Sequence, residues 1–407
     1  MEECAVEADE AETDRTVRTF ATVSFLHDMG SDMVFPVWPL FLRNVLKANM
    51  EVVGLVDGLG EAVVSMSSAL AGYASDRLRR RKVFIWSGYL MGAASRVGYA
   101  LVSSWPQVVP FKVLDRAGKV RTAPRDAIIA DLCVKRTRGS RFGLLRAMDN
   151  LGAVVGILFA IAFVTLFGHD YRTLFMLAAI PSVLGALLVV ARIKERKAEG
   201  VKVYRGLQLK DLGRDYYLFL ALSSIFALTA FSYSFLLIFA QREGYTDAFV
   251  PVLYLLFTAV AAIVSIPFGK LADSWGRKRV MSLSLLLWMS VSAVLMLWGS
   301  LLAVLLALVL YGMHKGALDP VQRAFVSELT PANFRASGLG AYQMVVGLLA
   351  LPAGLIAGTL WETVGPWAMF ALALALTSVA VVMLQFVRET EMPATGPDAE
   401  GTEGDGD

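Results

Sequence analysis

The sequence is poor in the residues that disulfide frameworks, metal sites and hydrolytic enzymes need. Its 407 residues include two cysteines and three histidines, which are far apart: Cys4, Cys133, His27, His169 and His314. We therefore expect no disulfide framework and no dedicated metal site. The chain also lacks a Gly-x-x-x-x-Gly-Lys-Ser/Thr phosphate loop, a His-Glu-x-x-His motif and a nucleophile elbow. These absences predict a protein that is not an enzyme, has no cofactor and is not driven directly by ATP.

Charged residues are also scarce, at 18% of the chain, whereas hydrophobic residues reach 56% and the mean hydropathy is +0.58. The apolar residues come in blocks of about 20, which is the length that a helix needs to cross a bilayer. This pattern excludes an ordinary soluble enzyme and predicts an all-α polytopic membrane protein with about twelve transmembrane helices. The predicted spans are 19–43, 52–75, 83–104, 107–131, 142–167, 171–192, 215–240, 248–271, 280–299, 301–326, 336–360 and 366–387.

Arginine and lysine gather in alternate connections between these spans, at 77–82, 135–141, 192–214 and 277–279. Basic loops stay on the cytoplasmic side of a membrane, so both termini are predicted to be cytoplasmic. The acidic N-terminal segment has neither the basic start nor the apolar core of a secretory signal, and no cleavage is expected. We expect a multi-pass protein of the cell's inner (plasma) membrane.

One of the basic loops occurs twice. Gly72-Tyr-Ala-Ser-Asp-Arg-Leu-Arg-Arg-Arg-Lys82 is echoed by Gly269-Lys-Leu-Ala-Asp-Ser-Trp-Gly-Arg-Lys-Arg279. An offset of 197 positions separates Gly72 from Gly269, Asp76 from Asp273, and Arg80 from Arg277. Such an offset is too long for a solenoid repeat and predicts two related halves, as in transporters built from duplicated bundles.

These loops, with the pattern Gly-x-x-x-Asp-(Arg)-x-(Gly)-Arg-Arg/Lys, resemble the signature loop of the major facilitator superfamily. The second copy matches better, because Arg79 stands where the first should have a glycine. The resemblance implies two six-helix bundles related by a pseudo-twofold axis, and a cytoplasmic gating network. The glycines would let helix ends approach closely, and the aspartates would pair with arginine or cap a helix. The gating residues are Gly72, Asp76, Arg77, Arg80, Gly269, Asp273, Gly276, Arg277 and Lys278.

The duplication and the composition divide the chain into five parts. The predicted parts are an acidic cytoplasmic tail at 1–14, a first bundle at 15–192, a cytoplasmic linker at 193–213, a second bundle at 214–389 and a disordered acidic tail at 390–407. The linker could contact anionic lipid, although a solvated charge run is the simpler interpretation.

Ionisable residues inside the spans carry functional information, because each must face a partner or water. Asp28 and Asp32 are four apart and share a helix face, and Asp57 and Glu61 repeat the arrangement on the next helix. Paired carboxylates of this kind can share a proton or hold a cation. Alternatively, they only pair with nearby arginines.

The fourth span is the most charged. Lys112, Asp115 or Arg116, Lys119 and Asp126 follow helical spacings of three, four and seven, which predicts one polar stripe. We expect a single network around the cavity of the first half. Its members are Asp28, Asp32, Asp57, Glu61, Arg96, Lys112, Asp115, Arg116 and Lys119.

A narrower resemblance covers most of the first half. The stretches 28–36, 114–127 and 146–153 look like a prokaryotic branch of the superfamily that is similar to drug and metabolite exporters. A basic residue on helix four of those exporters is implicated in proton coupling, and the resemblance makes Lys112 or Arg116 its counterpart. Helix five departs from the antiporter pattern, because Gly152-Ala-Val-Val-Gly156 is followed by isoleucine instead of proline.

In the second half, His314 and Lys315 on helix ten are the repeat equivalents of Ala117 and Gly118. We expect them to face the helix-four stripe near the membrane midplane, although a lone histidine is more often a packing residue.

Three functions remain open from the sequence. The favoured one is a secondary transporter that exports a small organic solute by alternating access and is coupled to protons. An importer or facilitator of an organic anion is the alternative, and a membrane sensor or scaffold without transport is the third. A monomer is expected, with no nucleic-acid partner.

Overall fold

The computed structural model describes residues 2–78, 80–132, 135–193, 195, 212–331 and 335–389. Its elements within these ranges are helices. They are α1 (Glu2–Val34), α2 (Trp38–Leu40), the π-helix η1 (Phe41–Val45), α3 (Met50–Leu78), α4 (Arg81–Leu101), α5 (Trp105–Ala117), the 3₁₀-helix η2 (Gly118–Arg121), α6 (Thr122–Leu132), α7 (Lys135–Phe167), α8 (Tyr171–Arg192), α9 (Arg214–Ala227), α10 (Tyr233–Arg242), α11 (Val250–Trp275), α12 (Arg277–Leu297), α13 (Leu301–Glu328), α14 (Arg335–Thr363) and α15 (Pro366–Gln385).

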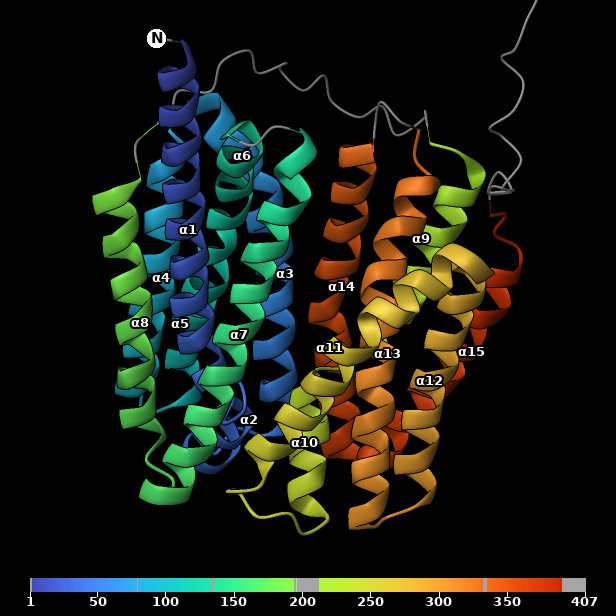
Figure 1. The fold of residues 1–407 in the computed structure, drawn as a ribbon. Coiled ribbons are helices and arrows are strands. Elements are labelled where there is room, and N and C mark those ends of the chain that lie inside the picture. The colour runs from blue at the N-terminus through green and yellow to red at the C-terminus, as the bar shows by residue number, and fades with distance from the viewer. Residues whose placement is uncertain are drawn as a thin grey trace, which may run out of the picture.

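The helices form two bundles that stand side by side, α1 to α8 in one and α9 to α15 in the other (Figure 1). When helices that continue one another are joined, the described part of the chain has six spans in each bundle. The predicted all-α fold of two six-helix bundles is confirmed. The predicted linker lies almost wholly outside the described residues, as does the C-terminal tail.

Seven described helices are long and apolar enough to cross a membrane, namely α7, α8 and α11 to α15. The other spans do not meet this condition, because α1, α3 and α4 carry charged and small polar residues and the remaining ones are broken into short helices. Polar residues are therefore concentrated on the first four spans, where burial within the protein has to replace contact with lipid.

Three predicted spans are not continuous helices. The first ends at Val34, before Pro36 and Pro39, which supply no backbone N–H for helix bonds. The seventh is interrupted between α9 and α10, where Ser232 caps the new helix by accepting a hydrogen bond from the N–H of Ser234 at 3.2 Å.

The fourth predicted span is divided by the 3₁₀ turn η2, so the predicted single stripe is interrupted. Pro124 near the start of α6 cannot donate the backbone hydrogen bond that would continue the helix. Gly118 also lies against α4, since a Cβ added to it would be 2.7 Å from the carbonyl oxygen of Gly88. This tight packing and the missing donor together explain the local change of helix type.

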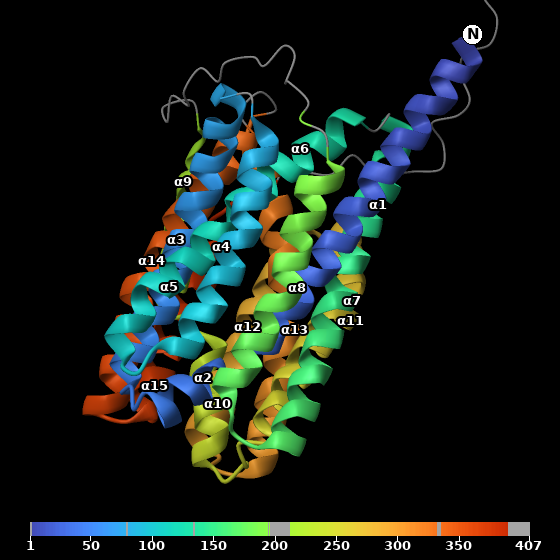
Figure 2. The ribbon, with the colours of Figure 1, turned by 90° about the vertical axis from the view of Figure 1, so that its left-hand side faces the viewer.

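The loops around Arg80 and Arg277 lie at one end of the bundles, which we call the basic face (Figure 1). The opposite end is called the far face. α1 begins at the basic face, and α8 ends there beside α4, as the second view shows (Figure 2). α1 starts at Glu2 and not near residue 19, because the alanine- and glutamate-rich N-terminal segment continues the helix.

Hydrogen bonds and ion pairs between the two bundles gather at the far face. Asn44 Nδ2 donates to Asp247 Oδ2 at 2.9 Å, and His169 Nε2 lies 3.3 Å from the same oxygen. The backbone N–H of Met50 donates to Glu362 Oε1 at 2.6 Å. The far face is therefore the closed one.

Candidate functional site

A cavity of about 120 Å³ lies between α1 and the α5–η2 segment. Asp28 and Asp32 line it from the same face of α1, as their spacing predicts. Neither carboxylate forms an ion pair with another described residue. The cavity is lined by His27, Asp28, Ser31, Asp32, Phe35, Asp115, Arg116, Lys119 and Arg121.

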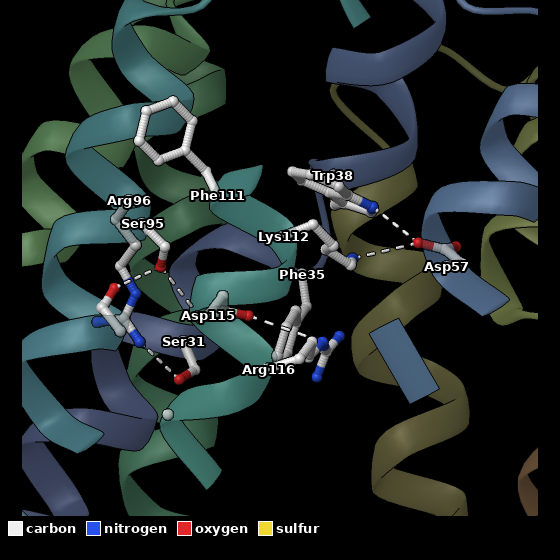
Figure 3. A network of polar contacts seen from close by, with 12 residues as sticks. Ser31, Phe35, Trp38, Asp57, Ser95, Arg96, Phe111, Lys112, Asp115 and Arg116 are labelled. Carbon is white, nitrogen blue, oxygen red and sulfur yellow. Dashed lines mark hydrogen bonds and ion pairs between the residues drawn. The ribbon is translucent and has the colours of Figure 1, made fainter. Parts of the chain in front are cut away.

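Lys112 and Asp57 form a buried ion pair between α5 and α3. Lys112 Nζ lies 3.2 Å from Asp57 Oδ1, and the two side chains are 4% and 8% exposed. Trp38 Nε1 donates to the same oxygen at 2.9 Å (Figure 3). The ammonium also lies 4.0 Å from the centroid of the Trp38 ring, which adds a cation–π contact. The pair is thus enclosed by the first bundle on one side.

The second bundle encloses the pair on the other side. Ser232 and Ser234 donate to Asp57 Oδ2 at 2.7 and 2.5 Å from the break between α9 and α10. Four donors therefore surround the Asp57 carboxylate, two from each bundle. These serines are not among the residues predicted for the site. Only the break in the helix turns both hydroxyl groups toward Asp57.

Arg116 and Asp115 form a second group. Arg116 Nε lies 3.7 Å from Asp115 Oδ2, and the guanidinium carbon lies 5.2 Å from the centroid of the Phe35 ring (Figure 3). Ser95 Oγ donates to Asp115 Oδ1 at 3.3 Å. These contacts hold the arginine along the wall of the cavity.

Arg96 belongs to a third group, which has no carboxylate in direct contact. Its guanidinium, 1% exposed, donates to the carbonyl oxygen of Ala178 at 2.9 Å and to Ser31 Oγ at 2.7 Å, and it also contacts Ser182 Oγ. The residue joins α1, α4 and α8 through neutral acceptors. The single network predicted for the first half is therefore divided into separate groups, and Arg96 ties helices together.

Glu61, Lys315 and Asp319 lie outside the cavity. Glu61 is exposed near the middle of α3. Lys315 Nζ lies 3.5 Å from Asp319 Oδ1 on the same helix, and these side chains are 42% and 57% exposed. Glu61 is near enough to Lys315 for the two charges to interact across the bundles. Lys315 and Asp319 lie far from either end of α13, and charged side chains in the middle of a span indicate that water reaches the space between the bundles.

His314 is a packing residue, so the expectation that it faces the helix-four stripe is wrong. Its side chain is 3% exposed and its Nδ1 lies 3.0 Å from Ser284 Oγ and 2.8 Å from the Ser284 carbonyl oxygen. The ring lies 5.2 Å from that of Trp288 and 5.8 Å from that of Phe226. The residue lies inside the second bundle because its position on α13 turns it away from the interface.

The first copy of the repeated loop lies partly outside the described residues. Gly72, Asp76 and Arg77 lie in α3, their surroundings are outside the described part of the structure, and their gating roles stay predictions. Arg80 is exposed and immediately precedes α4. Its neighbour Arg81 forms an ion pair with Asp131 at 2.5 Å.

The second copy is described in full and makes different contacts from those predicted. A Cβ added to Gly269 would meet no atom within 4 Å, so the expected close approach of helix ends is absent there. Asp273 is exposed and has no partner among the described residues. The α12 N-terminus is instead capped by Glu389, which accepts hydrogen bonds from the N–H groups of Arg277 and Lys278.

Other contacts of this copy hold the basic face of the second bundle together. Arg277 pairs with Glu328, and Lys278 Nζ donates to the carbonyl oxygens of Gln385 and Val387 at 2.7 and 3.0 Å. Gly276 has φ +99°, which glycine adopts without strain. All of these contacts stay within one bundle.

Some of the known proteins with similar sequences are named as transporters. The Major Facilitator Superfamily model matches residues 20–264 and 219–404. An uncharacterized MFS-type transporter of Methanocaldococcus jannaschii is 34% identical over 387 residues, with 93% of this chain and 96% of that protein covered. The multi-drug resistance efflux pump PmrA of Streptococcus pneumoniae is 27% identical over 331 residues, covering 76% and 79%.

The fold also matches solved structures. A peptide transporter POT variant superimposes with a TM-score of 0.73 at 15% identity, covering 91% of this chain and 93% of that one. At this identity the likeness concerns the fold alone.

Proposed function

Because this chain belongs to the Major Facilitator Superfamily and is a multi-pass membrane transporter, we propose that it exports a small organic solute by alternating access and takes up protons in exchange. The proposal places both termini and the basic face in the cytoplasm, as the distribution of arginine and lysine favours. The closed far face then faces outward. In this interpretation the described conformation is open toward the cytoplasm.

The observation that carries the proposal is the position of Asp57 between the two bundles. All four of its contacts are donors, and together they stabilise the ionised carboxylate. Opening the far face moves the second bundle away and removes Ser232 and Ser234. The carboxylate then keeps two donors and gains access to water from outside, which favours uptake of a proton.

Return to the described conformation restores both serine hydroxyls and favours release of the proton. The same carboxylate is thus stabilised differently in the two access states, and this difference links proton movement to the rocking of the bundles. Asp28 has no hydrogen-bond partner among the described residues of the second bundle, and Asp32 has a single neighbour there, Tyr254, whereas Asp57 accepts two hydroxyl hydrogen bonds from that bundle. We therefore assign the proton to Asp57, with Lys112 as its basic partner, and reserve the α1 pair for the solute.

A conformational measurement tests the coupling before any substrate is known. Spin labels at Phe167→Cys and Leu297→Cys, exposed residues at the far ends of α7 and α12, report whether that face opens. The native cysteines are replaced by serine. We expect acidification to lengthen this distance in the wild type.

The double variant Asp57→Asn with Lys112→Gln removes both charges together, so neither remains buried alone. We expect its label distance to be independent of pH, whereas Asp28→Asn with Asp32→Asn keeps the pH response. A pH response that survives the first variant would refute the role of Asp57. In proteoliposomes, solute flux indifferent to a proton gradient would favour the alternative, facilitated movement of the solute.

A further inference from the structure

The cavity next to α1 has two carboxylates on its α1 wall, whereas its α5–η2 wall is mainly basic and carries one carboxylate, Asp115, which is paired with Arg116. Asp28 and Asp32 project from α1, whereas Arg116 and Lys119 come from the α5–η2 segment. Opposite charges this close inside a membrane protein usually pair directly, because burying either one alone is costly. Their separation by open space therefore needs an explanation.

Lys119 is a basic residue of the cavity that lies apart from the carboxylates. Its ammonium forms no hydrogen bond or ion pair with any described residue, although Asp28 and Asp115 interact with it electrostatically. Asp28 and Asp32 are likewise without an ion pair. By contrast, Lys112, seven residues earlier in the same segment, is paired with Asp57. Asp28, Asp32 and Lys119 thus line the cavity without an ion pair to a described residue, whereas Arg116, also in the lining, pairs with Asp115.

The structure holds the walls apart by backbone packing. Gly156 of α7 packs on α1 next to Asp28, since a Cβ there would lie 2.2 Å from the carbonyl oxygen of Met29. On the other wall, Gly118 packs on Gly88, and a Cβ added to Gly88 would lie 2.6 Å from the carbonyl oxygen of Gly118. Helices fixed by such contacts cannot shift easily to let Lys119 reach the aspartates.

We propose that this cavity binds a small zwitterion, with its cationic group against Asp28 and Asp32 and its anionic group against Lys119 and Arg116. A ligand that carries both charges would compensate the charged side chains on both walls. A simple cation would leave Lys119 uncompensated, and a simple anion would leave two carboxylates facing it. The inference rests on the proposed function, because it names the solute class of that transporter.

The size of the cavity limits the ligand further. Its volume of about 120 Å³ corresponds to roughly four water molecules at about 30 Å³ each. Drug-binding pockets are usually larger, from about 300 Å³ upward, and mostly apolar. Phe35 is the one large apolar side chain in the cavity lining. A small amphoteric solute therefore fits better than a bulky hydrophobic drug.

The second bundle also approaches the acidic wall of this cavity, next to Asp32. Tyr254 of α11 is a hydrogen-bonding neighbour of Asp32. Alternating access requires a solute to be contacted by both bundles, and Tyr254 is the residue of the second bundle next to the proposed acidic subsite.

Equilibrium binding in detergent at a fixed pH tests the inference. Thermal unfolding of the purified protein is followed with matched sets of compounds that share a carbon skeleton, such as 4-aminobutyrate, butylamine and butyrate, extended to amino acids, betaines and neutral polyols. We expect the stabilising compounds to be zwitterions. If amines, simple acids or neutral compounds stabilise equally well, or if no zwitterion stabilises, the inference is wrong.

Substitutions in the cavity test whether the zwitterion binds there. Lys119→Gln should weaken binding of the stabilising zwitterion by about tenfold or more, the effect of one lost charge-assisted hydrogen bond, and Lys119→Arg should restore most of it. Asp32→Asn should weaken it similarly. Lys270→Gln, at an exposed lysine of α11, is the matched control and should leave binding unchanged. Equal effects of Lys270→Gln and Lys119→Gln would place the ligand elsewhere. Because no proton gradient is present, failure here leaves the coupling proposal to be judged by its own test.

Discussion

Gly54 of α3 and Gly354 of α14 are in direct backbone contact across the two bundles. A Cβ added to Gly54 would lie 1.9 Å from the carbonyl oxygen of Gly354, and one added to Gly354 would lie 2.1 Å from that of Gly54. Gly58 and Gly358 complete a Gly-x-x-x-Gly pair on each helix and make similar contacts. Small residues at this spacing let membrane helices approach closely. Closure of the far face thus depends on these glycines.

Gly354→Ala should therefore weaken closure of the far face, because its methyl group would have to displace the α3 backbone. We expect the distance between labels at Phe167→Cys and Leu297→Cys to lengthen and solute flux to fall. Gly340→Ala on the same helix is the control, because a Cβ there meets nothing within 4 Å. Identical label distances in both variants would contradict this role.

Ser232→Ala with Ser234→Ala should also shift the protein toward an open far face. Each hydroxyl donates to the Asp57 carboxylate, and a hydrogen bond to a charged group contributes about 1.5–3 kcal/mol. Loss of both should change the ratio of closed to open molecules by at least about tenfold, measured with the same labels. Ser265→Ala serves as the control, because this exposed hydroxyl bonds only within its own helix at 2.9 Å. An unchanged ratio in the double variant would show that the serines do not hold the bundles together.

Gly276→Ala should lower the stability of the second bundle by about 1 kcal/mol or more, because φ +99° is strained for alanine. Glu389 Oε2 would also lie 2.9 Å from the new Cβ. The control variant is Gly213→Ala. Gly213 precedes α9 with φ −69°, and a Cβ added to it would meet no atom within 4 Å. Chemical or thermal unfolding in detergent provides the measurement, and equal stability of the two variants would contradict the strain argument.

The membrane orientation can be tested by labelling single cysteines in intact cells. Phe167→Cys at the far face should react with a membrane-impermeant reagent from outside, whereas Trp275→Cys at the basic face should react only after lysis. Both side chains are exposed, at 69% and 58%. The reverse pattern would place the basic face outside and overturn the proposed direction of opening.

The sequence alone determined the class of this protein and its division into two bundles. Apolar blocks of bilayer length leave no alternative to helices, because backbone groups in lipid must be bonded within their own segment. The offset between Gly72 and Gly269 revealed the duplication. Pro36, Pro39 and Pro124, which lie at the breaks in the first and fourth spans, are also visible in the sequence.

The two Gly-x-x-x-Gly pairs that join α3 to α14 were likewise present in the sequence, at Gly54 and Gly58 and at Gly354 and Gly358. Their spacing indicates close helix packing but does not name the partner helix. The partner is decided by how the bundles meet, which involves segments that are 300 residues apart in this pair.

The charged residues of the site could be identified from the sequence, but their partners could not. Helical spacing predicts neighbours on one helix, whereas Lys112 pairs with Asp57, which is 55 positions away on another. Rotation of each helix about its axis also decides whether a charge lines a cavity, as Lys119 does, or is enclosed within a bundle, as His314 is. That rotation is fixed by packing against all neighbouring helices at once, so only the tertiary structure shows which charges meet and which are left to face a ligand.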